Sequence, residues 1–469
     1  MTNQEENTTG LKASAYNYRS QLPDGTLLFF NFYTLNLLAF DPDKAALAQR
    51  ILADPDKAPF DAAAVEIRTV LAEKGFLIPV AVDERERLRE ERVRSRTQGQ
   101  HLSLTILPTL ACNFRCTYCY ETHRGDTMTP RVEEALVAFV EQRLKQGGSM
   151  SVTWFGGEPL LAMDCIQRLT DQFLGICARK NAGYTAHVVT NGYLLDEACA
   201  DRLVACNLKR AQVTLDGPPE IHNRRRPLAD GRGSFERILA NLKSVAGKFT
   251  LNLRINVDED NRHTILDLMD LLEAEGLRGR VIPYLGRAYP YTEVCADVAG
   301  TCLSDADFAL LELETEMELI RRGLGGYRVI KGRSTNCVAD NPDAFVITPS
   351  GGIVNCWNHV ADPGAEIGHL LKPPDQQMQA NVHRWEALDP LKLQCADCLF
   401  LPVCMGGCPY HYLTRGELDC HHWKHHPDES LAFYHYVKCR EQEDEILRHF
   451  HQAVEEVKEL AEDPVCGPG

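Results

Sequence analysis

Short apolar segments alternate with helical segments six times between Leu102 and Tyr284, and this alternation constrains the fold more than any other feature of the sequence. The apolar segments occupy 102–108, 151–155, 186–190, 211–215, 251–257 and 280–284. The helical segments between them occupy 131–145, 164–180, 197–206, 234–246 and 261–275. Repeated strand–helix pairs form parallel sheets. We therefore predict an α/β fold, a partial (βα)6 barrel of the TIM type, whose chemistry lies at the carboxyl ends of the strands.

The regions that flank the barrel differ from it in composition. The run DERERLREERVRSR, at 83–96, is almost entirely charged and predicts an exposed linking helix. Beyond 325 the alternation ends, and nine of the eighteen cysteines lie there, which indicates a separate domain organised by metal. The expected divisions are a disordered tail at 1–14, a small winged-helix-like domain at 15–82, a charged linker helix at 83–100, the barrel at 101–324, a cysteine-rich domain at 325–445, and a C-terminal helix and tail at 446–469.

Charge and cysteine usage exclude several classes of function. The formal net charge of −16 argues against nucleic-acid binding, which needs a basic face to release counterions from phosphates. The first residues show no basic segment followed by an apolar run, so we expect neither a secretory signal nor a membrane span. Grouped thiols in a long chain of this kind bind metal more often than they form disulfides. We expect a cytoplasmic, metal-binding protein.

Three cysteines follow the first strand of the barrel in the loop TLACNFRCTYCYE. Cys112, Cys116 and Cys119 have the spacing C-x3-C-x2-C. Three thiolates can hold a four-iron cluster and leave one iron open to a further ligand. The alternative is a zinc site or a set of buried thiols, but zinc sites usually show C-x2-C pairs. The loop therefore predicts a [4Fe–4S] cluster with one open iron, which would be the catalytic centre.

With this loop at this place, the barrel resembles the radical S-adenosylmethionine (radical SAM) superfamily. The resemblance implies that the open iron binds S-adenosylmethionine and that Tyr118 packs by its adenine. It assigns Gly156, Gly157 and Glu158, in FGGEPL, to the methionine amino group. Glycines allow close backbone approach, and a carboxylate accepts charge-assisted hydrogen bonds from an ammonium. The alternative for GGEP is an ordinary turn.

Further polar residues stand at the ends of the next three strands. Thr190 and Asn191 in TNG are expected to reach the cofactor, and Asp216 in LDG to lie near its ribose or the substrate. Simple turn chemistry explains both motifs equally well. Arg254 alternates with apolar residues and should point into the barrel. Its partner is either the cofactor carboxylate, by resemblance, or Glu158 in an ion pair.

The C-terminal cysteines resemble the SPASM extension of radical SAM enzymes, which carries auxiliary [4Fe–4S] clusters. The resemblance implies a crossed pattern. A first cluster would take Cys337, Cys356 and Cys408, and a second would take Cys395, Cys398, Cys404 and Cys420. A zinc ribbon is the alternative. Cys439 competes with Cys420 as the last ligand.

The first auxiliary cluster lacks an obvious fourth thiolate, because no cysteine lies between Cys302 and Cys337. One possibility is an open iron that binds a thiolate of the substrate, since a coordinated thiol is deprotonated. The other is that Cys302, Cys439 or a water completes the cluster. The sequence leaves this choice open.

The combination of small domain, barrel and SPASM array resembles the maturases of ribosomally made peptides, including those that form thioether crosslinks. This implies that the N-terminal domain binds the leader of a precursor peptide by strand addition. It also implies that a 5'-deoxyadenosyl radical abstracts hydrogen from the peptide, and that an external electron donor of flavodoxin or ferredoxin type reduces the cluster. The alternatives are an anaerobic sulfatase-type maturase that makes formylglycine and a non-catalytic iron–sulfur electron-transfer protein.

Overall fold

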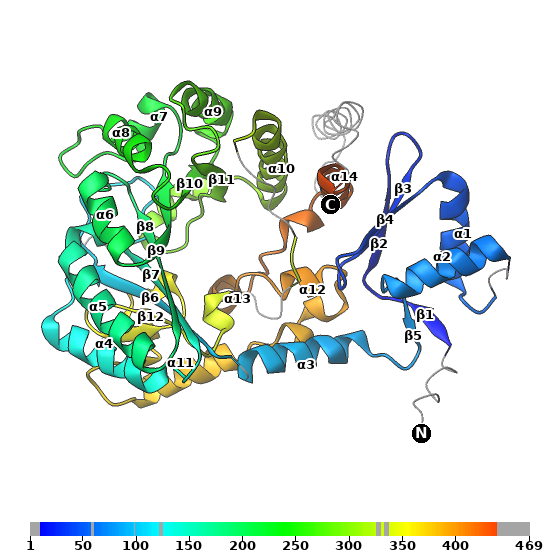
Figure 1. Ribbon diagram of the computed structural model, residues 1–469, viewed down its shortest axis with the longest axis horizontal. Coiled ribbons are helices and arrows are strands. Elements are labelled where there is room, and N and C mark those ends of the chain that lie inside the picture. Colours follow the sequence, from blue (N-terminus) through cyan, green and yellow to red (C-terminus); the bar gives the residue numbers. More distant parts are fainter. Residues whose placement is uncertain are drawn as a thin grey trace.

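A nine-stranded sheet forms the core of the larger part of the molecule, at the left in Figure 1. The computed structural model describes residues 10–57, 61–97, 99–121, 125–324, 330–332 and 337–438. The strand order is β11-β10-β9-β8-β7-β6-β12-β13-β14. The six barrel strands are parallel: β6 (His101–Thr109), β7 (Ser149–Gly156), β8 (Gly183–Thr190), β9 (Leu208–Thr214), β10 (Thr250–Val257) and β11 (Ile282–Arg287). The predicted α/β fold with a mostly parallel sheet is confirmed.

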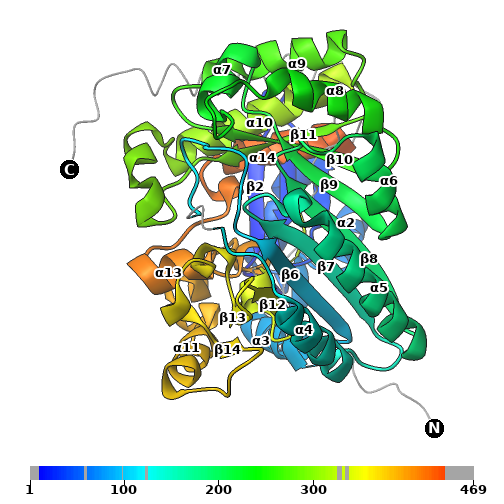
Figure 2. The same ribbon diagram turned by 90° about the vertical axis from the view of Figure 1, so that its left-hand side faces the viewer.

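Helices cover the outer face of this sheet, as Figure 2 shows. They are α4 (Pro130–Arg143), α5 (Met163–Arg179), α6 (Glu197–Ala205), α8 (Phe235–Val245) and α9 (Ile265–Ala274). Their apolar residues recur every three or four positions; in α5, Ile166, Leu169, Phe173 and Ile176 are all buried. This spacing places them on the face that meets the sheet. The sequence did not predict two further helices, α7 (Pro219–Arg225) and α10 (Asp305–Arg322).

The cysteine-rich region continues the barrel sheet rather than standing apart from it. Strand β12 (Ala344–Ile347) pairs in parallel with β6, with Ala344 opposite Ser103. Two short antiparallel strands follow, β13 (Gly352–Val354) and β14 (Gly368–His369). The expected boundary at 325 therefore precedes a segment that shares the barrel's hydrogen-bonded sheet. The remaining helices are α11 (Gln376–Glu386), α12 (Leu401–Cys404), α13 (Pro409–Arg415) and α14 (Pro427–Lys438).

The N-terminal domain consists of two helices and five short strands. Strands β2 (Asn17–Gln21), β3 (Leu27–Asn31) and β4 (Leu37–Phe40) form an antiparallel sheet, while β1 (Leu11–Ala13) pairs with β5 (Leu77–Pro79). Asp41 and Asp61 cap the helices α1 (Pro42–Ala53) and α2 (Ala62–Glu73), as the sequence position of each Asp favours. Phe29, Ile51, Leu71 and Phe76 are among the residues of its core.

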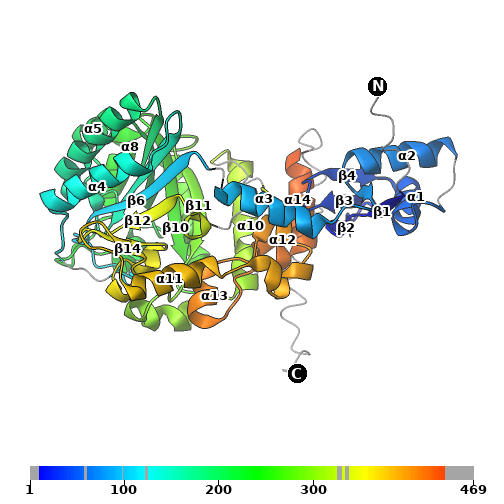
Figure 3. The same cartoon turned by 90° about the horizontal axis from the view of Figure 1, so that it is seen from below.

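Aromatic side chains join the N-terminal domain to the cysteine-rich region, at the end of the molecule away from the barrel (Figure 3). Phe30 lies 5.6 Å from Trp423 and 5.4 Å from Tyr434, ring centre to ring centre. Phe32 lies 4.5 Å from Phe400. Buried aromatic pairs contribute about 0.5–1.5 kcal/mol each beyond their area burial. The small domain is therefore fixed to the auxiliary region rather than tethered loosely.

The charged helix α3 (Glu84–Thr97) forms where the sequence predicted it, but its surroundings differ from the expected exposed linker. Leu88 is buried in the same aromatic cluster. Arg92, whose side chain is only 8% exposed, forms an ion pair with Asp340. Arg96 donates to the carbonyl oxygen of Asp340 at 2.7 Å. The charged sequence of this helix predicts an exposed surface, but two of its arginines bind a carboxylate about 250 residues away. The sequence pattern does not specify this partner.

Two further properties of the chain bear on its function. None of the helices in the described ranges is long and apolar enough to cross a membrane. All sixteen cysteines of the described residues are free thiols. Cys439 and Cys466 lie outside the described residues.

Candidate functional site

A cavity of about 310 Å³ opens at the carboxyl ends of the barrel strands, within the range of roughly 300–1,000 Å³ found for ligand pockets. Its walls come from the carboxyl-terminal halves of the barrel strands and from loops that follow several of them. The predicted site residues that line it are Cys112, Cys116, Tyr118, Cys119, Gly156, Gly157, Thr190, Asn191 and Arg254. Two predicted residues, Glu158 and Asp216, are not among the lining residues. The topology thus brings nine of the eleven residues proposed for the barrel site to one cavity.

The two glycines after β7 press against the loop that carries the cysteines. Gly156 has a φ of +119°, and a Cβ on it would overlap the carbonyl oxygen of Thr109. A Cβ on Gly157 would overlap the carbonyl oxygen of Ala111. The amide of Glu158 then donates to Ala111 at 2.8 Å. The glycines are required because two backbones meet here, and this contact holds the cysteine loop at the mouth of the barrel.

Glu158 is fully buried and forms the centre of a hydrogen-bond network below the cavity. Its carboxylate accepts from Leu160 N at 3.0 Å, Thr190 Oγ1 at 2.7 Å and Asn191 N at 2.7 Å. The side chain of Asn191 donates to Asn113 in the cysteine loop at 2.7 Å. Burial raises the pKa of Glu158, and the bond from the Asn191 amide opposes this effect. In this structure the carboxylate satisfies buried donors that join β7 to β8. Its contact with a cofactor amino group stays a prediction.

Asp216 is also fully buried, behind Tyr118. It accepts from the Tyr118 hydroxyl and, at 2.9 Å, from the amide of Asn256. The Tyr118 hydroxyl also accepts from Arg226 at 2.6 Å and from the Asn256 side chain at 3.0 Å. These bonds fix the tyrosine within the cavity wall. The structure places Asp216 where it supports Tyr118. Its place near the ribose or the substrate stays a prediction.

Arg254 lines the cavity and does not pair with Glu158, whose hydrogen bonds are made elsewhere. Its Nε donates to Asn256 Oδ1 at 2.7 Å, and its guanidinium lies 5.9 Å from the centre of the Tyr284 ring. Within the described residues no carboxylate forms a salt bridge with it. The alternative of an ion pair with Glu158 therefore finds no support.

Arg226 is a functional candidate that the sequence-based reasoning missed. It lines the cavity, is 7% exposed, and its Nε has no hydrogen-bond partner among the described residues. Its position beside Cys116 keeps its pKa well above the ordinary value, although burial opposes this. A buried guanidinium with an unpaired donor favours an anionic ligand. The only sequence signal was the run Arg224–Arg226 after LDG, which a solvated face would explain equally well.

Two groups of cysteines lie in the auxiliary region. Cys337, Cys356 and Cys408 form the first. Burial raises the pKa of the Cys356 thiol, and the proximity of Cys337 and Cys408 raises it further. Cys356 follows β13, Cys337 begins a short 3-10 helix, and Cys408 caps α13. Three segments far apart in the sequence therefore bring their thiols together.

The second group combines Cys395, Cys398, Cys404 and Cys420. Burial, together with the proximity of the other three thiols, raises the pKa of Cys395 to about 11. Lys424 Nζ lies 3.4 Å from the Cys420 sulfur. The grouping is the crossed one that the sequence suggested, with Cys420 beside the other three thiols. Cys439, the competing residue, lies outside the described residues.

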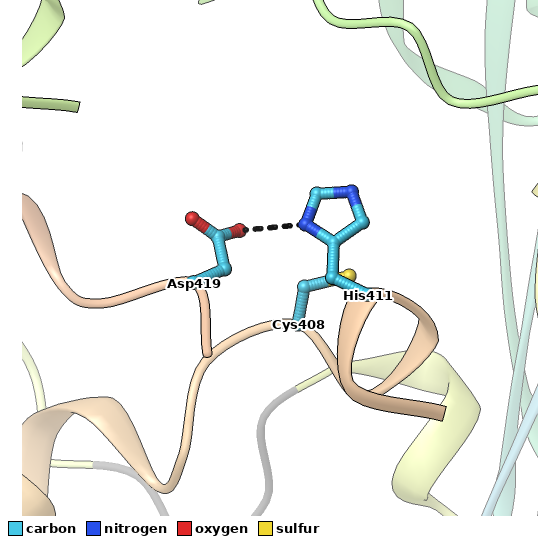
Figure 4. Close-up of side chains that lie close together, drawn as sticks. All are labelled: Cys408, His411 and Asp419. Atoms are coloured by element: carbon cyan, nitrogen blue, oxygen red, sulfur yellow. Dashed lines mark ion pairs between the residues drawn. The ribbon is translucent and has the colours of Figure 1, made fainter. Parts of the chain in front are cut away.

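The thiols are not spaced for single zinc ions. Zinc–sulfur bonds of roughly 2.3 Å in a tetrahedron place ligand sulfurs about 3.8 Å apart. Within the described parts of the chain, the one group of three His, Cys, Asp or Glu residues whose ligand atoms all lie within 4.8 Å of one another is Cys408, His411 and Asp419 (Figure 4). The thiolate donors, the cavity and the unpaired Nε of Arg226 together fit a [4Fe–4S] cluster and a cofactor that carries an anionic group.

Comparisons with known proteins agree with this geometry. Residues 106–272 match the radical SAM superfamily, and this part of the chain is a radical SAM domain. A cysteine-type anaerobic sulfatase-maturating enzyme of Clostridium perfringens (strain 13 / Type A) is 32% identical over 145 residues, which cover 29% of this chain and 39% of that protein. The fold is similar to native anSMEcpe with bound AdoMet (TM-score 0.55, 18% identity, 76% of this chain and 100% of that chain). It is also similar to Streptococcus suis SuiB bound to precursor peptide SuiA (TM-score 0.51, 13% identity, 86% and 97%).

These findings define the class of the protein. The match spans about two fifths of the length of the first curated relatives. The relatives of the domain are enzymes, and the superfamily binds a [4Fe–4S] cluster and S-adenosylmethionine, as the sequence predicted. The low identity to the solved structures makes them a guide to the fold alone.

Proposed function

We propose that this chain is a peptide maturase that uses the radical SAM centre to crosslink a ribosomally made precursor, with a cysteine thioether as the product. The observation that carries the proposal is that the cavities beside the two metal regions share part of their walls. A second cavity, of about 450 Å³, is lined by Cys337, Cys404, Cys408 and Cys420. Four residues line both cavities: Arg254, Arg287, Tyr289 and Tyr291.

Neighbouring cavities of this kind suit a peptide that must be oxidised by two electrons. The three cysteines of the radical site line the first cavity, and thiols of both auxiliary groups line the second. A peptide residue held beside Tyr289 and Tyr291 would lie next to both cavities. The shared wall comes from β10, β11 and the segment that follows β11.

The chain's own residues supply the binding functions. Cys112, Cys116 and Cys119 would hold the cluster, and Arg226 would bind the carboxylate of S-adenosylmethionine. When bound, this pair supplies a 5'-deoxyadenosyl radical that removes a hydrogen atom from a peptide carbon. Closing the carbon–sulfur bond then releases the proton of the cysteine thiol and one electron. The thiol proton would pass to solvent, and clusters held by the auxiliary cysteines would accept the electron.

The N-terminal domain provides a place for the leader of the precursor. In the described residues β4 pairs only with β3, so its other edge is open to strand addition. SuiB, solved with a bound precursor peptide, aligns with a larger share of this chain than anSMEcpe does. The leader edge and the cavities are parts of one packed unit, because the aromatic contacts join the domain to the cysteine-rich region.

An electron donor and a cellular location accompany the proposal. An external flavodoxin or ferredoxin would reduce the radical site, because the reaction begins with electron transfer into the cluster. The protein would work in the cytoplasm, where the free thiols of the described residues stay reduced and clusters are assembled.

A sulfatase-type maturase that makes formylglycine is the second candidate. The 32% identity to the Clostridium perfringens enzyme favours it. The open strand edge of the N-terminal domain favours the peptide maturase.

The test uses the reconstituted full-length protein, S-adenosylmethionine, a reductant and the cysteine-bearing peptides encoded next to its gene. Thioether formation removes two hydrogens and one alkylatable thiol from the peptide, as mass spectrometry shows directly. The same peptide without its leader should react poorly. Loss of sulfur with gain of an aldehyde would instead establish the second candidate. An unchanged peptide accompanied by steady cleavage of S-adenosylmethionine would contradict the proposed substrate.

A further inference from the structure

The first auxiliary group contains three thiols, and the structure narrows the choice of a fourth ligand. Cys302, one alternative from the sequence, donates its thiol to the carbonyl oxygen of Val298 at 3.1 Å and does not line the second cavity. Cys439 lies outside the described residues. A different side chain stands beside the group instead, on the helix that Cys408 begins.

Asp419 faces the ring of His411, and the sulfur of Cys408 lies beside the histidine side chain, as Figure 4 shows. Their ligand atoms lie within 4.8 Å of one another, and His411 Nδ1 is 3.6 Å from Asp419 Oδ2. Cys408 precedes α13 and His411 lies in its first turn, three residues later, so both side chains share one face. Gly407 has a φ of +75°, and a Cβ on it would overlap the carbonyl oxygen of Asp419. The backbone packing therefore holds Asp419 against the loop before Cys408.

The imidazole of His411 is buried beside Cys408 and Asp419. The residue is 5% exposed, and its Nε2 has no hydrogen-bond partner among the described residues. Tyr289 stacks on the ring at 4.6 Å and 29°, and Tyr291 at 5.6 Å and 26°. A buried polar atom without a partner is rare and usually has a ligand or a functional role. The aromatic walls fix the ring, so its nitrogens cannot turn to solvent.

We infer that His411, positioned by Asp419, is the fourth protein ligand of the first auxiliary cluster, beside Cys337, Cys356 and Cys408. The inference rests on the proposed function, which places a [4Fe–4S] cluster there. Histidine is a known ligand of iron–sulfur centres, and a carboxylate beside a ligating histidine orients its ring. A cluster with four protein ligands has no open iron, so the substrate thiolate does not bind to it. Its task is to accept the electron released when the crosslink closes.

The experiment uses full-length protein in which Cys112, Cys116 and Cys119 are replaced by Ala, so that only the auxiliary clusters assemble. The protein is labelled with 15N-histidine, reconstituted anaerobically with iron and sulfide, reduced, and examined by pulsed EPR. We expect the strong 15N coupling of a directly bonded imidazole. His411→Cys should retain the iron content, lose this coupling and lower the midpoint potential, because a thiolate replaces a neutral ligand. His422→Ala, at another histidine that lines the same cavity, should retain the coupling.

Two results would overturn the inference: no strong coupling in the parent protein, or a coupling that survives His411→Cys. Asp419→Asn should keep the coupling but change its size, because the ring loses its orienting carboxylate. Peptide modification is not part of this measurement. A protein that fails to modify any peptide can still show the coupling, and a protein that forms thioethers without the coupling would contradict only the ligand assignment.

Discussion

Replacement of Glu158 by Gln tests whether its carboxylate stabilises the fold or binds the cofactor. In the structure the two carboxylate oxygens accept three hydrogen bonds, from Leu160 N, Thr190 Oγ1 and Asn191 N. Gln retains one oxygen and places an NH2 group where the other oxygen was. Whichever way the amide turns, at least one backbone N–H faces a donor and loses its partner.

The expected loss of stability in Glu158→Gln follows from these hydrogen bonds. A buried donor left without a partner costs about 1–3 kcal/mol. Removing the buried charge offsets part of this loss of stability, because burial disfavours the ionised form of Glu158 and raises its pKa. We therefore expect a net loss at the lower end of this range, about 1 kcal/mol. For a domain of 150–250 residues this lowers the unfolding midpoint by about 2–4 °C per kcal/mol.

The assay is thermal unfolding of the apoprotein under anaerobic conditions, combined with equilibrium binding of S-adenosylmethionine to the reconstituted protein. Glu141→Gln is the control, since that side chain is 44% exposed and surface substitutions usually change stability by less than about 0.5 kcal/mol. A carboxylate that contacts the cofactor ammonium predicts the opposite pattern. Unchanged stability with a loss of affinity on the order of tenfold, the value of a charge-assisted bond, would refute the supporting role.

Three other substitutions test the remaining assignments. Replacing Cys112, Cys116 and Cys119 by Ala should remove about four irons and all cleavage of S-adenosylmethionine, by iron analysis and product assay; retained cleavage would contradict the radical site. Arg226→Met should weaken cofactor binding roughly tenfold or more, while the exposed Arg232→Met should not, and equal affinities would show that Arg226 only supports Tyr118. Phe30→Ala should cost about 3–5 kcal/mol at the aromatic cluster and expose the N-terminal domain to limited proteolysis. Deletion of residues 1–80 is a poorer test of leader binding, because it uncovers Trp423 and Tyr434.

The sequence by itself determined the barrel and the position of its chemistry. The period of the apolar residues specifies six strands and the helices between them, because a strand buried on both faces and an amphipathic helix have different patterns. Once the strands are parallel, their carboxyl ends share one edge, so the loops with Cys112, Gly156 and Asn191 had to meet. The resemblance to SPASM proteins suggested two groups of auxiliary thiols, and the members of each group lie near one another in the structure.

Only the tertiary structure decided which polar side chains face the cavity and which lie beneath it. Glu158 and Asp216 stand in the same kind of turn as residues that line the cavity, and a local motif does not specify on which side of the loop a carboxylate finds its donors. Arg226 and His411 gave no clear sequence signal, because each depends on partners more than a hundred residues away, Tyr118 and Tyr289. The same reason explains why β12 pairs with β6 and why Phe30 packs on Trp423. The sequence shows which apolar and hydrogen-bonding groups must be buried, but only the folded chain shows which partners bury them.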